Sequence, residues 1–478
     1  MRPKTPLQAK TPFALNPRPI AGAITSRAGL CVPSRALRSL GLPQQCAANL
    51  PTKQRHRGYL AAQHVESLVL LNLAGGDCLE DLGILRDDGG VKKMLGYQAP
   101  SARSAGEFLE LFHDEPGLRA ARQEADQQGR LAIIPEESSL LQGLRLVQQG
   151  NVRAIAAKTR SLALATIDMD ATIIASEKRS ATRTYEGPRG YQPMVAVWAE
   201  ADLIAADEFR DGNVPAAMAP LACAQAAFAA LPAHVTRFGF RGDSACHEHG
   251  LIDWLRDEDR EGGPKGRIDF AVSARMSDEL RAALKAVPEK GWTWLGEEAD
   301  GTIKQWAEVD FVPGEKSEKK TLKPLRYIGL RFLKPQGELF ADGHDRRFLA
   351  VLTNRVERGD KVVEWHREKA GTVEHVHEEL KNGLGGGRLP SNKFGANAAW
   401  FRIACLAYNI LSATRQHWPD ESLRTAKSKR LRLAVFSVSG RFSRDSRKIS
   451  LGFAAPQSWI RMVIDFFRRF ELVTRSTG

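Results

Sequence analysis

Three charged side chains stand at intervals of seven residues in the later half of the chain: Arg367, Glu374 and Lys381. They belong to a charged segment that is followed by a Gly-rich turn and an apolar segment. Seven residues are close to two turns of an α-helix, so all three side chains would share one helix face. One carboxylate between two cations suits a metal site that handles a phosphate chain. A solvated helix face with chance ion pairs is the alternative interpretation.

Further carboxylates lie in or just after predicted strands. Asp168 and Asp170 belong to a short apolar, β-prone run, and because side chains alternate along a strand, both point to the same face. An acid in a core strand costs free energy unless it has a partner or binds a metal, and an edge strand whose acids reach water is the alternative. Asp243 comes just after another predicted strand, at the end where α/β sheets bind their ligands.

These acids are far apart in the sequence, so only the fold can bring them together. We expect Asp170, with Asp168 as its rival, to form one site with Asp243 and Glu374. Carboxylate clusters of this kind bind two divalent ions about 3.5–4 Å apart, one activating an attacking oxygen and the other stabilising a leaving oxygen. Hard cations prefer carboxylate oxygens, so we expect two Mg²⁺ ions, with Mn²⁺ as a substitute.

The order of predicted elements around the acids indicates the fold class. From residue 161 onward, three strands come first, followed by helix, strand, helix, strand and helix. This order is that of a ribonuclease-H-like core, an α/β mixed sheet flanked by helices. The nucleotide-binding patterns GxGxxG and GxxxxGK[ST] do not occur. Strand-like runs at residues 291–345 interrupt the core and predict an inserted β subdomain, after which the core resumes.

The N-terminal part of the chain has a different texture. Residues 1–65 contain no Asp or Glu, and we interpret this segment as a mostly disordered basic tail: a DNA-binding arm, an organellar transit peptide, or an extension from an upstream start codon. The helical segment after it is either a helix-turn-helix DNA reader or a small bundle. We divide the chain into residues 1–60, the tail; 61–155, a helical DNA-binding region; 156–290, the first part of the catalytic core; 291–345, the β insertion; 346–420, the second part of the core with the Glu374 helix; and 421–478, C-terminal strands and a helix.

Composition narrows the range of partners. The formal net charge is +13 and the pI is about 9.5, which favours a polyanionic partner, nucleic acid before an anionic membrane. No apolar run reaches the roughly 18 residues that a membrane span needs, so we expect no membrane partner. The six cysteines form no CxxC pair, which argues against a zinc ribbon or a disulfide framework and fits the reducing cytoplasm.

Several motifs carry a resemblance to a known family. They run from about His64 to the C-terminus and are IDMDAT, YEGPRGYQPM, FRGDSA, AGTVEHVHEELKNGLG and FGANAAWFR with YNIL after it. In these motifs the chain resembles a DDE transposase of the bacterial insertion-sequence type, family 1380. The resemblance implies a ribonuclease-H-like core with a β insertion before the catalytic Glu, and Mg²⁺-dependent cleavage at transposon ends followed by insertion into target DNA. It also implies a homodimer that joins two double-stranded DNA ends in a synaptic complex.

Matched residue by residue, the family's first Asp is Asp170, the second is Asp243 and the Glu is Glu374. The resemblance makes these three the expected catalytic residues and metal ligands, with Asp168 as the rival for the first ligand. An inactive copy that only binds DNA ends, or a stand-alone ribonuclease-H-like nuclease, is the alternative to an active transposase.

The expected DNA contacts lie on the same helix as the catalytic Glu. The family's Lys seven residues after the Glu is Lys381. Related enzymes also carry a Tyr seven residues and an Arg four residues before the Glu, where this chain has Arg367 and Ala370. This departure shifts the expected phosphate contacts to Arg367 or Lys369.

Overall fold

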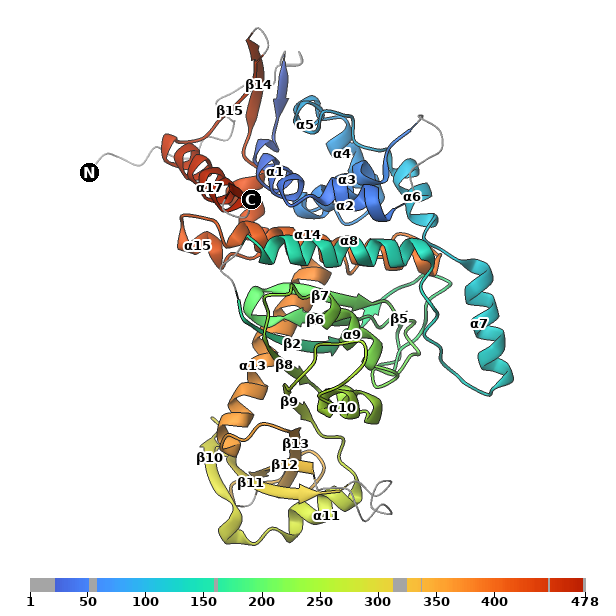
Figure 1. The fold of residues 1–478 in the computed structure, drawn as a ribbon, viewed down its shortest axis with the longest axis vertical. Helices are drawn as coiled ribbons and strands as arrows, with labels where there is room; N and C mark the ends of the chain where they lie inside the picture. The colour runs from blue at the N-terminus through green and yellow to red at the C-terminus, as the bar shows by residue number, and fades with distance from the viewer. Residues whose placement is uncertain are drawn as a thin grey trace, which may run out of the picture.

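The computed structural model describes residues 22–50, 58–158, 162–312, 325–336, 338–445 and 448–475. A nine-stranded sheet runs through the molecule, and the N-terminal helices lie beyond one end of it (Figure 1). Two long helices, α8 (Ser139–Ala156) and α14 (Phe394–Arg415), run side by side between those helices and the sheet (Figure 1). Among the described residues, no helix is both long and apolar enough to cross a membrane.

Five strands at one end of the sheet follow one another along the chain as predicted for a ribonuclease-H-like core. They are β2 (Leu164–Ala171), β6 (Met194–Trp198), β7 (Leu203–Glu208), β8 (Arg237–Gly242) and β9 (Ile268–Ser273). β2 lies between its antiparallel neighbour β6 and its parallel neighbour β8, and β7 and β9 continue the sheet on either side. The first three strands are therefore antiparallel and the last two run parallel to the first, which confirms the predicted α/β fold class.

The side chains of β6 and β7 are covered on both faces of the sheet, although β7 is its outermost strand. All side chains of β6 and β7 are buried, as expected for strands that are covered on both faces. α8, α14 and α9 (Leu221–Ala229) pack on β7. α10 (His249–Arg256) and α11 (Asp278–Ala286) follow the parallel strands β8 and β9, and α10 makes the crossover connection that such strands need.

The strands of the predicted β insertion extend the sheet of the core. The strands of the insertion are β10 (Thr293–Glu297), β11 (Ile303–Phe311) and β12 (Leu325–Leu333), and β13 (Arg346–Thr353) is the strand with which the core resumes. They pair in that order, and β13 pairs antiparallel with β9, so one sheet continues from the core into the insertion. Ala271 of the core and Trp306 of the insertion also share one apolar cluster, which Val362 and Val363 cover.

The charged and apolar segments around Glu374 form the predicted pair of helices. α13 (Gly359–Glu378) ends in a π-helical turn, and α14 begins after a Gly-rich segment. In that segment Gly385 has a φ of 72°, a left-handed conformation that favours glycine. A side chain there would also meet the carbonyl oxygen of Gly76, so the turn packs against the N-terminal helices.

Residues 23–50 are folded, contrary to the expectation of a disordered tail. They form β1 (Ala23–Thr25), α1 (Cys31–Ser39) and α2 (Leu42–Asn49). Val32 and Leu37 are fully buried, because apolar residues at helical spacing give the segment a face that packs although it carries no acid. β1 also pairs with β14 (Gly440–Asp445) near the C-terminus. The beginning of the predicted tail, residues 1–21, lies outside the described residues.

The helical region predicted for residues 61–155 consists of six helices. Those before α8 are α3 (Ala61–Ala74), α4 (Leu82–Arg86), α5 (Gly89–Leu95), α6 (Ala102–Glu110) and α7 (Glu115–Gln127). α3 is buried over most of its length and packs against α2 and α14. The region is therefore a helical layer built around α3, joined to the catalytic core through α8 and α14.

The C-terminal segment differs from the prediction at its start. The run LRLAVF, predicted as a strand, is helical and includes a π-helical turn at Arg432–Phe436. Its Val435 and Phe436 are buried, and the turn packs against α3, so tertiary contacts outweigh local β propensity. The strands β14 and β15 (Lys448–Phe453) and the amphipathic helix α17 (Gln457–Arg475) follow.

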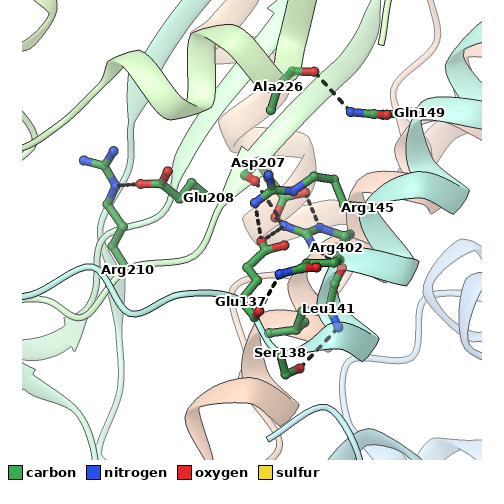
Figure 2. A network of polar contacts seen from close by, with 11 residues as sticks. Glu137, Ser138, Leu141, Arg145, Gln149, Asp207, Glu208, Arg210, Ala226 and Arg402 are labelled. Carbon is green, nitrogen blue, oxygen red and sulfur yellow. Dashed lines mark hydrogen bonds and ion pairs between the residues drawn. The ribbon is translucent and has the colours of Figure 1, made fainter. Parts of the chain in front are cut away.

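A buried network of ion pairs joins the helical layer to the sheet (Figure 2). The guanidinium of Arg402, on α14, lies 3.0 Å from Asp207 of β7 and 2.7 Å from Glu137, which precedes α8. Arg145 of α8 approaches the same Glu137 carboxylate at 2.9 Å. Charges as deeply buried as those of Arg402 and Asp207 are tolerated only when they are paired and hydrogen-bonded. The network therefore fixes how α8 and α14 lie on β7.

Arg402→Met should lower the free energy of unfolding by about 3–5 kcal/mol, because Asp207 then keeps a buried charge without its partner and Glu137 retains only Arg145. Denaturant unfolding followed by circular dichroism measures the change. Arg103→Met is the matched control, since Arg103 forms an exposed pair with Glu107 and such pairs contribute about 0–1 kcal/mol. Equal stabilities of the two variants would contradict the role assigned to the network.

Candidate active site

Parallel pairing of β2 and β8 brings two acids together. Met169 pairs with Gly242, so the residues that follow them, Asp170 and Asp243, reach the same carboxyl end of the sheet. Burial raises the pKa of the Asp243 carboxyl, and the negative charge of Asp170 raises it further. Two acids that are remote in the sequence thus form a carboxylate pair at the carboxyl ends of two neighbouring strands, as the strand pattern predicts.

Short hydrogen bonds to the backbone orient both carboxylates. Oδ1 of Asp170 accepts a bond of 2.9 Å from the backbone N–H of Ala171. Oδ1 of Asp243 accepts a bond of 3.1 Å from the backbone N–H of Ala245, at the start of the turn that leads to α10. The Asp170 carboxylate is therefore held at the end of β2, and the Asp243 carboxylate by the turn that follows β8.

Lys369 of α13 contacts this carboxylate pair directly. Its ammonium lies 3.1 Å from Oδ2 of Asp170, and the Lys369 side chain is only 12% exposed. The positive charge also acts on Asp243, where it opposes the rise in pKa. Lys369 is one of the phosphate contacts expected from the family resemblance, and in the structure its charge lies beside the acids.

Asp168, the alternative to Asp170 as first metal ligand, is engaged in a buried ion pair. Its side chain is fully buried and forms two hydrogen bonds with Arg241, at 2.6 Å to Oδ1 and 2.9 Å to Oδ2. The hydroxyl of Thr372 also donates to Oδ2. Asp168 does share a strand face with Asp170, but its oxygens are taken by the partner that a buried charge requires.

The Asp168–Arg241 pair also attaches α13 to the sheet. Arg241 lies directly beside Asp168 in the register of β2 and β8. It donates hydrogen bonds from Nη1 to the carbonyl of Trp365 at 2.8 Å and to the carboxylate of Glu368 at 2.6 Å. With Thr372 bonded to Asp168 as well, one buried ion pair links two strands to the helix that carries Glu374.

Two histidines of α13, His377 buried and His366 partly buried, complete the contact between α13 and this end of the sheet. Nε2 of His366 donates to the backbone carbonyl of Gly242 at 3.0 Å. Burial lowers the pKa of both His366 and His377 to about 4, so both rings are neutral at pH 7. His377 lies close enough to Asp170 for the two to interact, and its buried Nε2 has no hydrogen-bond partner among the described residues.

Glu374 lies on the same helix but is exposed. It precedes His377 by three residues, which places the two side chains next to each other along the helix surface. Arg367 is exposed and Lys381 is half-buried. The structure therefore brings Asp170 and Asp243 together. It places Glu374 about one helical turn from His377, which interacts with Asp170.

The donor set at the sheet edge fits a divalent cation. Asp170 and Asp243 offer hard carboxylate oxygens, and their mutual repulsion is of the kind that a cation relieves. Asp77, Cys78 and Asp81 are the one set of three potential ligand residues with atoms within 4.8 Å of one another in the described part of the chain. That group belongs to the helical layer. Among the described residues, Glu374 does not form such a close group with Asp170 and Asp243.

Sequence reasoning missed the residues that hold the site together. Arg241, Thr372 and His377 had no assigned role, although one signal was present. Arg241 directly follows a predicted core strand, and Asp168 was an acid without a partner in another predicted core strand. The parallel register of the two strands was the missing information.

Asp168→Asn should lower the free energy of unfolding by about 3–5 kcal/mol, because Arg241 then keeps a buried charge without its counter-ion. Asp170→Asn, two residues later on the same strand face, should cost far less, since the Asp170 side chain is 23% exposed and Lys369 is flexible. Denaturant unfolding of both variants measures the difference. An equal or larger loss for Asp170→Asn would contradict the separate roles of the two aspartates.

Known proteins with a similar sequence or structure identify the family of the chain. No curated protein matches the chain. A cryo-EM structure of a piggyBac transposase synaptic complex with hairpin DNA is similar at a TM-score of 0.44 and 9% sequence identity, over 86% of this chain and 80% of that one. The family model described as transposase DDE domain group 1 matches residues 20–474. Because that match spans nearly the whole chain, the protein belongs to the family of transposase DDE domains of group 1.

Proposed function

We propose that this protein is an active DNA transposase that cuts at the ends of its own element and joins those ends to target DNA. The observation that carries the proposal is the carboxylate pair of Asp170 and Asp243 at the carboxyl edge of a ribonuclease-H-like sheet. Membership of the transposase DDE family gives that pair its reaction class. Glu374 is the third acid of the proposed site, supplied by α13.

The residues at the sheet edge would hold two divalent ions, Mg²⁺ or Mn²⁺. Such ions supply the positive charge that stabilises the attacking and leaving oxygens of a phosphodiester. Asp170 and Asp243 would bind them from the sheet and Glu374 from the helix. His366 would help to fix the position of α13 through its hydrogen bond to the carbonyl of Gly242.

Double-stranded DNA is the proposed substrate, both as transposon ends and as target. The net charge of +13 favours binding to a polyanion. Arg367 and Lys381, on the helix that carries Glu374, would position phosphates near the acids, since backbone contacts orient a duplex without reading its sequence. The helical layer at residues 61–155 would recognise the terminal repeats. Two subunits, each with one DNA end, would form the active complex in the bacterial cytoplasm.

Asp243→Asn should cleave a labelled duplex that carries an element end about 10²–10³-fold more slowly than the wild type, because a bound metal contributes several kcal/mol to such a reaction. Gel analysis of the product in Mg²⁺ measures the rate. Asp269→Asn is the matched control, since Asp269 lies on the neighbouring strand β9 and pairs with Arg267. Full activity of Asp243→Asn would remove Asp243 from the site.

Strand joining separates a transposase from a nuclease with the same core. A pre-cut element end with a 3′-hydroxyl should be joined to a target plasmid, whereas the same end with a 3′-deoxy terminus should not be joined, because the hydroxyl oxygen is the nucleophile. Cleavage without any joining would indicate a stand-alone nuclease. Binding without cleavage in Mg²⁺ and in Mn²⁺ would indicate an inactive end-binding protein.

A further inference from the structure

Lys369 occupies an unusual position for a residue on a DNA-binding helix. Its ammonium lies 3.1 Å from Oδ2 of Asp170, and its side chain is 12% exposed. Arg367, two residues earlier on the same helix, is exposed to solvent. The Lys369 charge is thus turned inward to the carboxylate pair, while the neighbouring cation is turned outward.

The carboxylate pair needs a positive charge even before any metal binds. Two carboxylates at close range repel each other, and Asp243 is also disfavoured as an anion by burial. An ammonium beside Asp170 offsets part of this repulsion. It also lies beside an oxygen that a divalent ion would use, so its positive charge would repel an ion that binds there.

We infer that Lys369 is the resident cation of the metal-free site: it stabilises the carboxylate pair and leaves Asp170 when a divalent ion binds. The inference rests on the proposed function only in assigning divalent ions to this pair. A lysine suits this role, because its ammonium is a single point charge on a flexible stem with rotatable donors. α13 itself stays in place through Thr372 and Arg241, so only the stem has to move.

Two features of the helix distinguish this role from a permanent structural ion pair. The backbone of α13 is attached by the Asp168–Arg241 pair, one turn away, so the helix does not depend on Lys369 for its position. The Asp170 side chain is 23% exposed, so an incoming ion can reach it from solvent. Once released, the ammonium would be free to contact a phosphate of the DNA.

The test is the affinity of the full chain for Mn²⁺ alone, measured by isothermal titration calorimetry and by the EPR signal of free Mn²⁺. An opposite charge next to a carboxylate shifts its affinity for a proton by about one to three powers of ten. Lys369→Met should therefore bind Mn²⁺ at least about tenfold more tightly than the wild type. Lys361→Met is the matched control and should bind like the wild type, since Lys361 pairs with Glu364 on the exposed side of the same helix.

Equal or weaker Mn²⁺ binding by Lys369→Met would overturn the inference. The proposed metal site would still stand after that outcome if the wild type binds Mn²⁺ and Asp243→Asn weakens the binding. If neither the wild type nor Lys369→Met binds Mn²⁺, the metal site itself is wrong and the inference falls with it.

Thermal unfolding gives a second readout that does not depend on activity. Without metal, Lys369→Met should melt below the wild type, and saturating Mn²⁺ should raise its Tm by more than it raises that of the wild type. Lys369→Gln is the second uncharged variant, for use if the Met variant does not fold. If both variants stay unfolded, recovery of the fold by Mn²⁺ supports the inference, and failure to recover overturns it.

Discussion

The ion pair between Asp168 and Arg241 is the contact on which the rest of the site depends. It is buried between two parallel strands, and Arg241 also bonds to the backbone and a side chain of α13. Replacing one partner would leave the other charged in a nearly dry interior, so this contact is costly to break. It sets the distance between the strands that end in Asp170 and Asp243 and the helix that carries Glu374.

A division of labour between neighbouring aspartates follows from this constraint. Asp168 pairs with Arg241 in the interior. Asp170 lies at the strand end, where its carboxylate is partly exposed. Asp243 lies beside it because the strands are parallel and in register. Lys369 then balances a pair that would otherwise repel, and the network around Arg402 holds the helical layer on the far edge of the same sheet.

Local patterns predicted much of this structure, and long-range register accounts for what they missed. Apolar periodicity was enough to predict the order of the core strands and helices. Alternation placed Asp168 and Asp170 on one face but could not choose between them, because the choice depends on which acid lies beside Arg241. The absence of acids suggested disorder for residues 23–50, where buried apolar residues such as Val32 decide otherwise. The inward direction of Lys369 depends on how α13 packs on the sheet, and the seven-residue spacing along the helix does not predict that packing.

Anomalous diffraction from crystals of the protein grown with Mn²⁺ tests the proposed metal site most directly. We expect anomalous peaks at the carboxyl edge of the sheet, within about 2–2.5 Å of carboxylate oxygens of Asp170 and Asp243. Glu374 should be drawn onto the same ions, and Asp168 should still be bonded to Arg241. Peaks confined to Asp77, Cys78 and Asp81, or a peak on Asp168 in place of Asp170, would contradict the site described here.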